Sequence, residues 1–263
     1  MERRSTPMQT VILAGGLGTR LAEETSVRPK PLVEIGDRPI LHHIMDVYDA
    51  HGFKDFVLAL GYLGHMIKRY VVDWTTLSGN LAVDLTTGHV TRHAAPNRDW
   101  HVSLIETGND TQTGGRLKRC APHLRDETFM LTYGDGLSNV DLKSLVAFHR
   151  SHGRLATVTA VHPPARFGEM DLNHHEVAAF TEKPQTRQGW INGGFMVLEP
   201  KVLDYISGDD TNLEHDVLTQ LSAEGQLCAF RHDGFWQCMD TLRDVKSLTT
   251  LWESGSPPWV GRT

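Results

Sequence analysis

The chain has few cysteines, and their number and spacing exclude two kinds of scaffold. Its three cysteines, Cys120, Cys228 and Cys238, are odd in number and lie far apart in the sequence. Such spacing gives neither a disulfide framework nor a C-x-x-C metal site. A reducing compartment is the simplest setting for this composition, and we expect a cytoplasmic protein.

Long apolar runs are also absent. No stretch approaches the roughly twenty apolar residues that a membrane-spanning helix needs. The opening segment MERRSTPMQT has basic residues but no apolar core after them, so we expect no signal peptide. The sequence therefore predicts no membrane partner.

Positive charge is not in excess either. Lys and Arg number 26 against 32 Asp and Glu, a formal net charge of -6, and the basic residues are scattered. We therefore expect no nucleic-acid partner and only local phosphate binding. The 15 histidines include the pairs His42-His43 and His174-His175. Adjacent side chains point to different sides of a helix or strand, so we expect no histidine metal site.

A glycine-rich loop follows the first apolar segment. In VILAGGLGTRL, from Val11 to Leu21, a buried strand runs into glycines that let the backbone approach an anion, and Arg20 adds a charged fork suited to phosphate. The P-loop pattern fails because no Gly-Lys pair follows, and G-x-G-x-x-G fails because Leu21 occupies its last position. These letters leave two interpretations open, an anion-binding loop of another kind and a structural turn.

Apolar periodicity predicts alternating strands and helices. With 263 residues, 40% of them hydrophobic, the chain can bury one substantial core. We expect strands near 11–14, 56–61, 128–136, 156–161, 176–184, 191–200 and 227–232, and helices near 39–52, 62–74, 141–153, 214–225 and 241–253. This order predicts an α/β fold with a mainly parallel central sheet flanked by helices.

One segment departs from that rhythm. Residues 80–107 read as short alternating stretches separated by Gly and Asn turns. We expect a single domain over 8–260, with 80–107 as a small β-rich insertion and 1–7 as a flexible N-terminal extension.

Two aspartates follow predicted strands. Asp135 stands between two glycines in TFMLTYGDG, and Asp240 follows a short apolar stretch in FWQCMDTLRD. In open α/β sheets, ligands collect beyond the carboxyl ends of the strands, and Mg²⁺ commonly binds one or two carboxylates together with phosphate oxygens. Two structural alternatives stay open: Asp135 hydrogen-bonding within its own turn, and Asp240 as the N-cap of a helix that opens at Thr241.

Basic residues stand at matching element ends. Lys30 in RPKPL and Lys183 in TEKP each precede a proline, which favours extended backbone and so gives the side chain a defined direction. Each lysine alone is also consistent with solvated surface. Together with Arg20 and the two aspartates, they predict a site for two phosphorylated molecules and a metal.

The remaining candidate residues suit a sugar. Glu182 offers an acceptor for sugar hydroxyls, or alternatively a surface salt bridge. The INGGF stretch contains Asn192, Gly193 and Gly194 inside a predicted strand. Glycine within a strand often marks the close approach of a ligand.

These motifs, in this order, resemble the sugar-1-phosphate nucleotidyltransferases, and in particular the glucose-1-phosphate cytidylyltransferases. The resemblance runs from about residue 8 to residue 259. It rests on GGLGTRLAEET, PKPLVEIG, TGGRLKR, YGDG, RFGEMDL, EKP, INGGF and FWQCMDTLRD. The stretch TGGRLKR indicates the cytidylyl branch, because thymidylyl and uridylyl relatives usually carry other residues there.

The resemblance implies a Rossmann-like nucleotidyltransferase fold, a homo-oligomer such as a hexamer, and synthesis of CDP-glucose and pyrophosphate from CTP and glucose 1-phosphate with Mg²⁺. Catalysis would fall to Arg20, Lys30 and Lys183. The nucleotide would contact Leu13, Gly15, Gly16, Gly18, Thr19, Arg20, Lys30, Gly114 and Asp135. Asp135 and Asp240 would hold the metal, and Glu182, Lys183, Asn192 and Gly194 would bind the sugar phosphate.

Two rival functions stay open, a uridylyl- or thymidylyltransferase and a non-catalytic nucleotide-binding relative. The chain also departs from the resemblance at TNLEHDVL, where glucose-specific relatives usually carry T-x-W-E-x-x-P-L. Leu213 and Val217 replace the tryptophan and the proline. This exchange either repacks a core or subunit contact, or relaxes selectivity for the sugar, and our hypothesis is the second.

Overall fold

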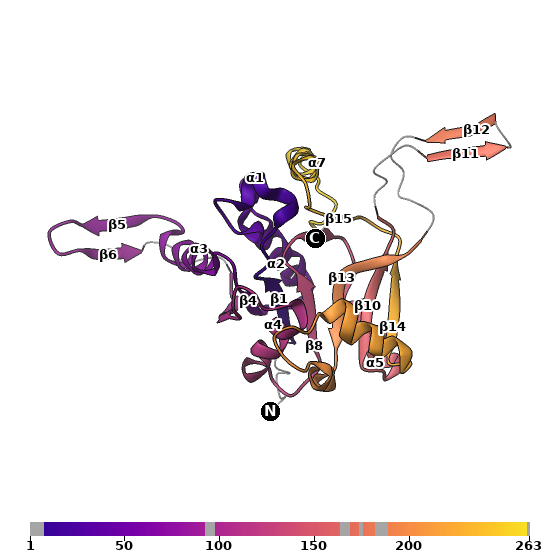
Figure 1. The fold of residues 1–263 in the computed structure, drawn as a ribbon. Helices are drawn as coiled ribbons and strands as arrows, with labels where there is room; N and C mark the ends of the chain where they lie inside the picture. Colours follow the sequence, from indigo (N-terminus) through magenta and orange to yellow (C-terminus); the bar gives the residue numbers. More distant parts are fainter. Residues whose placement is uncertain (1–7, 93–97, 164–168, 174–175, 182–188, 262–263) are drawn as a thin grey trace, which may run out of the picture.

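A seven-stranded sheet forms the centre of the molecule. The computed structural model describes residues 8–92, 98–163, 169–173, 176–181 and 189–261. In spatial order the strands are β14 (Leu227–His232), β10 (Ala156–Val161), β13 (Ile191–Leu198), β8 (Phe129–Tyr133), β1 (Gln9–Ala14), β4 (Asp55–Leu60) and β7 (His101–Glu106) (Figure 1). Within this sheet only β13 runs antiparallel to its neighbours, so the predicted mainly parallel α/β fold is confirmed.

Helices and loops cover both faces of the sheet, because successive side chains of a strand point to opposite sides. On one face, Ile12 and Ala14 of β1 belong to a core shared with α2 (Ile40–Ala50), α3 (Gly64–Leu77), α5 (Leu142–His152) and α7 (Leu242–Glu253). On the other, Val11 and Leu13 pack with α4 (Thr113–Cys120), η4 (Pro200–Tyr205), η5 (Leu213–Leu218) and α6 (Thr219–Ala223). Every residue of β1 and β4 is buried, as the continuous apolar runs predict.

The predicted β-rich insertion is shorter than expected. Strands β5 (Leu81–Asp84) and β6 (His89–Arg92) form an antiparallel hairpin that projects away from the body of the molecule (Figure 1). The following strand, β7, pairs in parallel with β4 and is an edge strand of the central sheet. The prediction was therefore wrong for the end of 80–107, because an edge strand with mixed exposure resembles an outlying hairpin in sequence.

Short ribbons complete the fold. A second hairpin, β11 (Glu169–Asn173) and β12 (Glu176–Thr181), also projects from the body (Figure 1). Strands β2 (Glu34–Ile35) and β3 (Arg38–Pro39) form a tight turn, and β9 (Gly136–Ser138) pairs with β15 (Trp236–Cys238). The short helical segments are η1 (Thr19–Leu21), α1 (Ala22–Thr25), η2 (Lys30–Leu32) and η3 (Ala121–His123).

The histidine pair on α2 serves packing. Nδ1 of His42 is hydrogen-bonded to the hydroxyl of Tyr70, and burial lowers the pKa of His42 to about 4. His43 faces another way, with Nε2 hydrogen-bonded to the carbonyl of Ile35. The pair His174-His175 lies outside the described residues. In the described part of the chain, no helix is both long and apolar enough to span a membrane.

Candidate active site

The glycine loop connects the carboxyl end of β1 to η1. Gly15 is buried, and a Cβ there would lie 2.3 Å from Nη1 of Arg116. Gly16 has open space around it, and Gly18 has a φ of 64° that side chains disfavour. The hydroxyl of Thr25 donates to the carbonyl of Gly18 at 3.0 Å and fixes the end of the loop.

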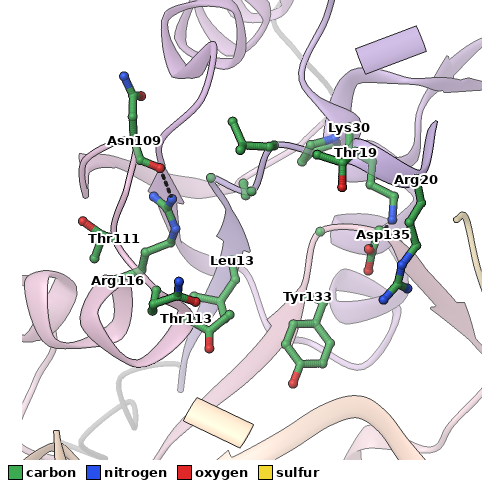
Figure 2. Close-up of a pocket in the computed structure, with 18 of the residues that line it drawn as sticks. Leu13, Thr19, Arg20, Lys30, Asn109, Thr111, Thr113, Arg116, Tyr133 and Asp135 are labelled. Carbon is green, nitrogen blue, oxygen red and sulfur yellow. Dashed lines mark hydrogen bonds and ion pairs between the residues drawn. The ribbon is translucent and has the colours of Figure 1, made fainter. Parts of the chain in front are cut away.

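A cavity of about 600 Å³ opens above this loop. Its walls face each other in Figure 2. One wall carries Asn109, Thr111, Thr113 and Arg116, and the opposite wall carries Thr19, Arg20, Lys30 and Asp135. One wall is thus rich in hydrogen-bonding groups around the buried Arg116, while the other gathers carboxylates with the exposed Arg20 and the largely buried Lys30.

Arg116 fixes the first wall from within. Its guanidinium donates to the hydroxyl of Thr107 at 2.9 Å and to the carbonyls of Gly108 and Asn109 at 2.6 and 3.0 Å. A Cβ on Gly61 would come as close to Nη1 as one on Gly15, at 2.3 Å. The guanidinium therefore needs both glycines, and it sets the backbone of the segment that leads to Thr113.

The two predicted metal-binding aspartates are brought together by the β9–β15 ribbon. Gly136 pairs with Cys238, so Asp135 and Asp240 stand at the same end of the ribbon, one residue before β9 and two residues after β15. The backbone N–H of Met239 donates to the carbonyl of Asp135 at 2.8 Å. The ribbon thereby holds Asp135 and Asp240 close together, although they are 105 positions apart in the chain (240 − 135).

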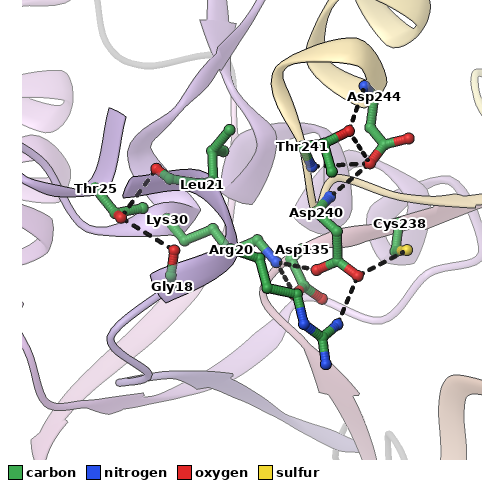
Figure 3. A network of polar contacts seen from close by, with 10 residues as sticks. All are labelled: Gly18, Arg20, Leu21, Thr25, Lys30, Asp135, Cys238, Asp240, Thr241 and Asp244. Carbon is green, nitrogen blue, oxygen red and sulfur yellow. Dashed lines mark hydrogen bonds and ion pairs between the residues drawn. The ribbon is translucent and has the colours of Figure 1, made fainter. Parts of the chain in front are cut away.

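Lys30 lies between these two carboxylates. Its Nζ is 2.7 Å from Oδ2 of Asp135 and 2.7 Å from Oδ1 of Asp240, and Nη1 of Arg20 is 2.8 Å from Oδ2 of Asp240 (Figure 3). Burial raises the pKa of Asp240, but Lys30 and Arg20 outweigh it and hold that pKa below its ordinary value. Burial lowers the pKa of Lys30, and the two carboxylates raise it further than that, so its pKa lies above the ordinary value.

This arrangement fits a magnesium ion that keeps phosphate and water ligands. Asp135 and Asp240 each direct one carboxylate oxygen at Nζ of Lys30. Carboxylate oxygens are the ligands that Mg²⁺ prefers in proteins. Within the described residues, no three or more His, Cys, Asp or Glu side chains are arranged to hold a metal. A metal bound here would complete its coordination with water or with oxygens of a substrate.

A second cavity, of about 480 Å³, adjoins the first. It is lined by residues from β8, β9, β13, η5 and β15, among them Asn192, Gly193, Trp236 and Cys238. Both cavities are lined by the same five residues at their junction: Arg20, Thr113, Tyr133, Asp135 and Asp240. The carboxylate pair therefore stands where two ligands would meet.

A hydrogen-bonded network forms one wall of the second cavity. The hydroxyl of Tyr133 and that of Thr113 each donate to one carboxylate oxygen of Glu214, the latter at 2.7 Å. Nδ2 of Asn192 donates to the Tyr133 hydroxyl at 3.2 Å. The network joins strands β8 and β13 to the start of α4, which also borders the first cavity.

Several predicted residues lie elsewhere than expected. Gly194 faces the Tyr133 ring, since a Cβ there would lie 2.4 Å from Cδ2, and the residues lining the second cavity are its neighbours Asn192 and Gly193. Gly114 packs against the carbonyl of Thr211 instead of lining the first cavity. The predicted residues Glu182 and Lys183 lie outside the described part of the chain.

Two structural alternatives are also decided. The N-cap of α7 is Thr241, so Asp240 precedes the cap and its carboxylate is directed to Lys30 and Arg20. Leu213 and Val217 are fully buried in the core on the α4 face of the sheet. The structure thus favours a packing role for this pair.

No sequence pattern indicated a role for Arg116, Thr113, Tyr133 or Glu214. All four stand within the motifs TGGRLKR, YGDG and TNLEHDVL, but their roles depend on contacts between segments far apart in the chain. Thr113 and Glu214, for example, are 101 positions apart. No local pattern signals such a contact.

The chain is similar to known nucleotidyl transferases over nearly its full length. The sequence profile of the nucleotidyl transferase family matches residues 9–245. The glucose-1-phosphate cytidylyltransferase of Salmonella typhimurium is 48% identical over 96% of this chain and 98% of the relative. A probable glucose-1-phosphate cytidylyltransferase of Bacillus subtilis is 42% identical over 96% of this chain and 99% of the relative.

Solved structures share the fold at lower identity. HddC from Yersinia pseudotuberculosis superposes with a TM-score of 0.69 at 24% identity, covering 93% of this chain and 99% of that one. A putative glucose-1-phosphate thymidylyltransferase from Bacillus anthracis gives 0.67 at 18% identity, covering 93% and 94%. These likenesses extend the agreement from the sequence to the central sheet.

Proposed function

Because this chain belongs to the nucleotidyl transferase family, we propose that it makes CDP-glucose and pyrophosphate from CTP and glucose 1-phosphate. The observation that carries the proposal is the junction of the two cavities at Asp135 and Asp240. CTP would occupy the cavity above the glycine loop, and the sugar phosphate would occupy the second. Both phosphates would then meet beside the carboxylate pair.

The reaction needs no general base. At neutral pH the sugar phosphate is already anionic. One of its oxygens attacks the α-phosphorus of CTP in line, a new P–O bond forms, and the bond from the α-phosphorus to the bridging oxygen breaks to release pyrophosphate. The barrier lies in bringing two anions together and in stabilising charge on the leaving group.

Cationic side chains address both parts of that barrier. Arg20 stands at the junction and Lys30 bridges its two aspartates from the first cavity, where they would neutralise the triphosphate and hold it in line with the attacking oxygen. Lys183, from the sequence analysis, would bind the sugar phosphate. A Mg²⁺ ion held by Asp135 and Asp240 would supply further charge neutralisation when bound.

The substrates follow from the relatives and from the shape of the walls. The segment Asn109–Thr113 offers backbone and side-chain hydrogen-bonding groups and would face the base, on the wall opposite the charged residues. Glu214 and Asn192 would face the sugar hydroxyls, because carboxylate and amide oxygens accept hydrogen bonds from them.

The test is release of pyrophosphate with glucose 1-phosphate and, in turn, CTP, UTP, GTP, ATP and dTTP. We expect CTP to give the highest kcat/KM by at least about tenfold, a difference of about 1.4 kcal/mol in transition-state binding. Mass spectrometry should identify the product as CDP-glucose. A higher kcat/KM with UTP or dTTP would establish the uridylyl or thymidylyl alternative.

A non-catalytic relative would behave differently. It would bind a nucleotide, detected by calorimetry, and release no pyrophosphate with any triphosphate. The presence of both Asp135 and Asp240 argues against that outcome. A homo-oligomeric assembly and a cytoplasmic location stay predictions from the sequence.

A further inference from the structure

Asp240 stands on a short connection between two regular elements. Strand β15 ends at Cys238 and helix α7 begins at Leu242. On the β15 side, the connection is held by the hydrogen bond from Met239 to the carbonyl of Asp135. On the α7 side, it is held by one residue of the first turn, Asp244.

One oxygen of Asp244 accepts three hydrogen bonds. Oδ2 receives the backbone N–H of Thr241 at 2.8 Å, the hydroxyl of Thr241 at 2.9 Å and the backbone N–H of Asp240 at 3.0 Å (Figure 3). The backbone bond from Thr241, with the return bond from Asp244 N to the Thr241 hydroxyl, forms an ordinary capping box. The hydrogen bond from the backbone N–H of Asp240 to Asp244 is additional to the capping box. Asp240 lies one residue before the N-cap and carries one of the two carboxylates of the site.

The helix that carries Asp244 is firmly packed. Leu248 is buried in the core, and the ring of Trp252 covers Gly36, where a Cβ would lie 1.9 Å from Cδ1. The guanidinium of Arg38 lies 5.1 Å from the centre of the same ring. Gly36 and Arg38 belong to the β2–β3 turn that follows Lys30. Through these contacts, helix α7 fixes the backbone of Asp240 relative to the segment that carries Lys30.

We propose that Asp244 is a positioning residue for the metal-binding carboxylate of Asp240. The inference rests on the proposed function, in which Asp240 holds Mg²⁺. Asp244 lines neither cavity and so acts through the backbone of Asp240. Partners that orient a metal-ligating carboxylate are typically worth about 10- to 100-fold in metal affinity or activity.

Binding of Mn²⁺ alone tests the proposal without any substrate. Free Mn²⁺ is measured by electron paramagnetic resonance with the original protein, Asp244→Ala and Thr241→Ala. The matched control Thr241→Ala removes the N-cap hydroxyl but keeps the bond from Asp240 to Asp244. We expect Asp244→Ala to weaken Mn²⁺ binding by at least about tenfold and Thr241→Ala by less than about threefold. The Tm should fall by a similar amount in the two variants, because both break the same capping box.

Further variants make each outcome decisive. Asp244→Asn keeps an acceptor oxygen and should fold if Asp244→Ala does not, with an intermediate loss of affinity. Equal weakening in Asp244→Ala and Thr241→Ala, or none in any Asp244 variant, would overturn the positioning role alone. Asp240→Asn should abolish binding, and if it binds Mn²⁺ normally, both the metal assignment and this inference are overturned. The Mg²⁺ concentration for half-maximal pyrophosphate release should rise in the same order.

Discussion

The guanidinium of Arg116 lies directly against the Cα of Gly15, so that a methyl group on Gly15 would come within 2.3 Å of Nη1. This contact joins the glycine loop after β1 to helix α4, which begins 98 residues later by the difference between Thr113 and Gly15. The guanidinium cannot retreat freely, because its other contacts are with Gly61, Thr107 and Gly108. The absence of a side chain at Gly15, together with that at Gly61, therefore lets the glycine loop approach helix α4 this closely.

We expect Gly15→Ala to destabilise the fold by about 1–3 kcal/mol, the usual cost of overpacking. For a chain of this size that corresponds to a fall in Tm of roughly 2–12 °C, measured by differential scanning calorimetry. Gly208→Ala is the matched control, since a Cβ there meets nothing within 4 Å and its φ is not positive. An unchanged Tm in Gly15→Ala would contradict the packing argument.

Gly16→Ala should separate binding from stability. A Cβ at Gly16 has open space in the protein, so we expect Tm to change by no more than about 2 °C. If the loop approaches triphosphate oxygens with bare backbone, the added methyl should raise the KM for CTP by about tenfold, with a smaller change for glucose 1-phosphate. A normal KM for CTP would mean that phosphates do not approach Gly16.

The sequence predicted the residues of this site better than their arrangement. Arg20, Lys30, Asp135 and Asp240 were predictable because each stands at the end of a strand or in a proline-flanked turn, where ligands of α/β sheets collect. The bridging position of Lys30 between the two aspartates was not predictable. It depends on the pairing of β9 with β15, two three-residue strands in which Ser138 pairs with Trp236, 98 positions later by the difference of their numbers.

Asp135→Asn and Asp240→Asn should each lower kcat by at least about a hundredfold, or about 2.7 kcal/mol in the barrier, while the protein stays folded. Each change removes a charge that would hold Mg²⁺ without removing a core group. Asp73→Asn is the charge-matched control, since Asp73 on α3 is half-buried and pairs only with its helical neighbour Arg69 among the salt bridges described. Near-normal kcat in both site variants, measured by pyrophosphate release, would exclude the two-carboxylate metal site.

The depressed pKa of Asp240 predicts a pH dependence of stability. Its folded-state pKa lies below the ordinary value of 3.8, so the charged carboxylate stabilises the fold above that value and the stabilisation is lost as the pH falls through the folded pKa. We therefore expect the Tm difference between the original protein and Asp240→Asn to move in favour of the variant below about pH 4. In a Lys30→Met background, we expect burial to raise the pKa of Asp240 above its ordinary value. The sign then reverses, and the Tm difference should move in favour of the protein that keeps Asp240 as the pH falls through the raised pKa.

Two features of the fold could not be predicted from the sequence pattern. Strand β13 is fully buried over most of its length and reads like its parallel neighbours, yet it runs antiparallel to both. Direction within a sheet is set by the path of the connections, and the connection before β13 contains the β11–β12 hairpin. Strand β7, by contrast, was assigned to the insertion because 80–107 reads as short alternating stretches separated by turns. In the structure its residues are only partly buried, as expected at an edge.

The buried position of Leu213 changes the expectation for sugar selectivity. From the sequence, the exchange of tryptophan for leucine was a candidate for relaxed selectivity. The Leu213 side chain is instead fully buried among core residues, while its neighbour Glu214 faces the second cavity.

Leu213→Trp should therefore lower stability by about 1–3 kcal/mol through overpacking, since Val217 is also buried in this core. The ratios of kcat/KM for glucose, galactose and mannose 1-phosphates should stay within about threefold of the original, below about 0.7 kcal/mol in transition-state discrimination. Ratios that shift further toward glucose would show that the side chain at position 213 controls the position of Glu214, and they would restore the selectivity hypothesis.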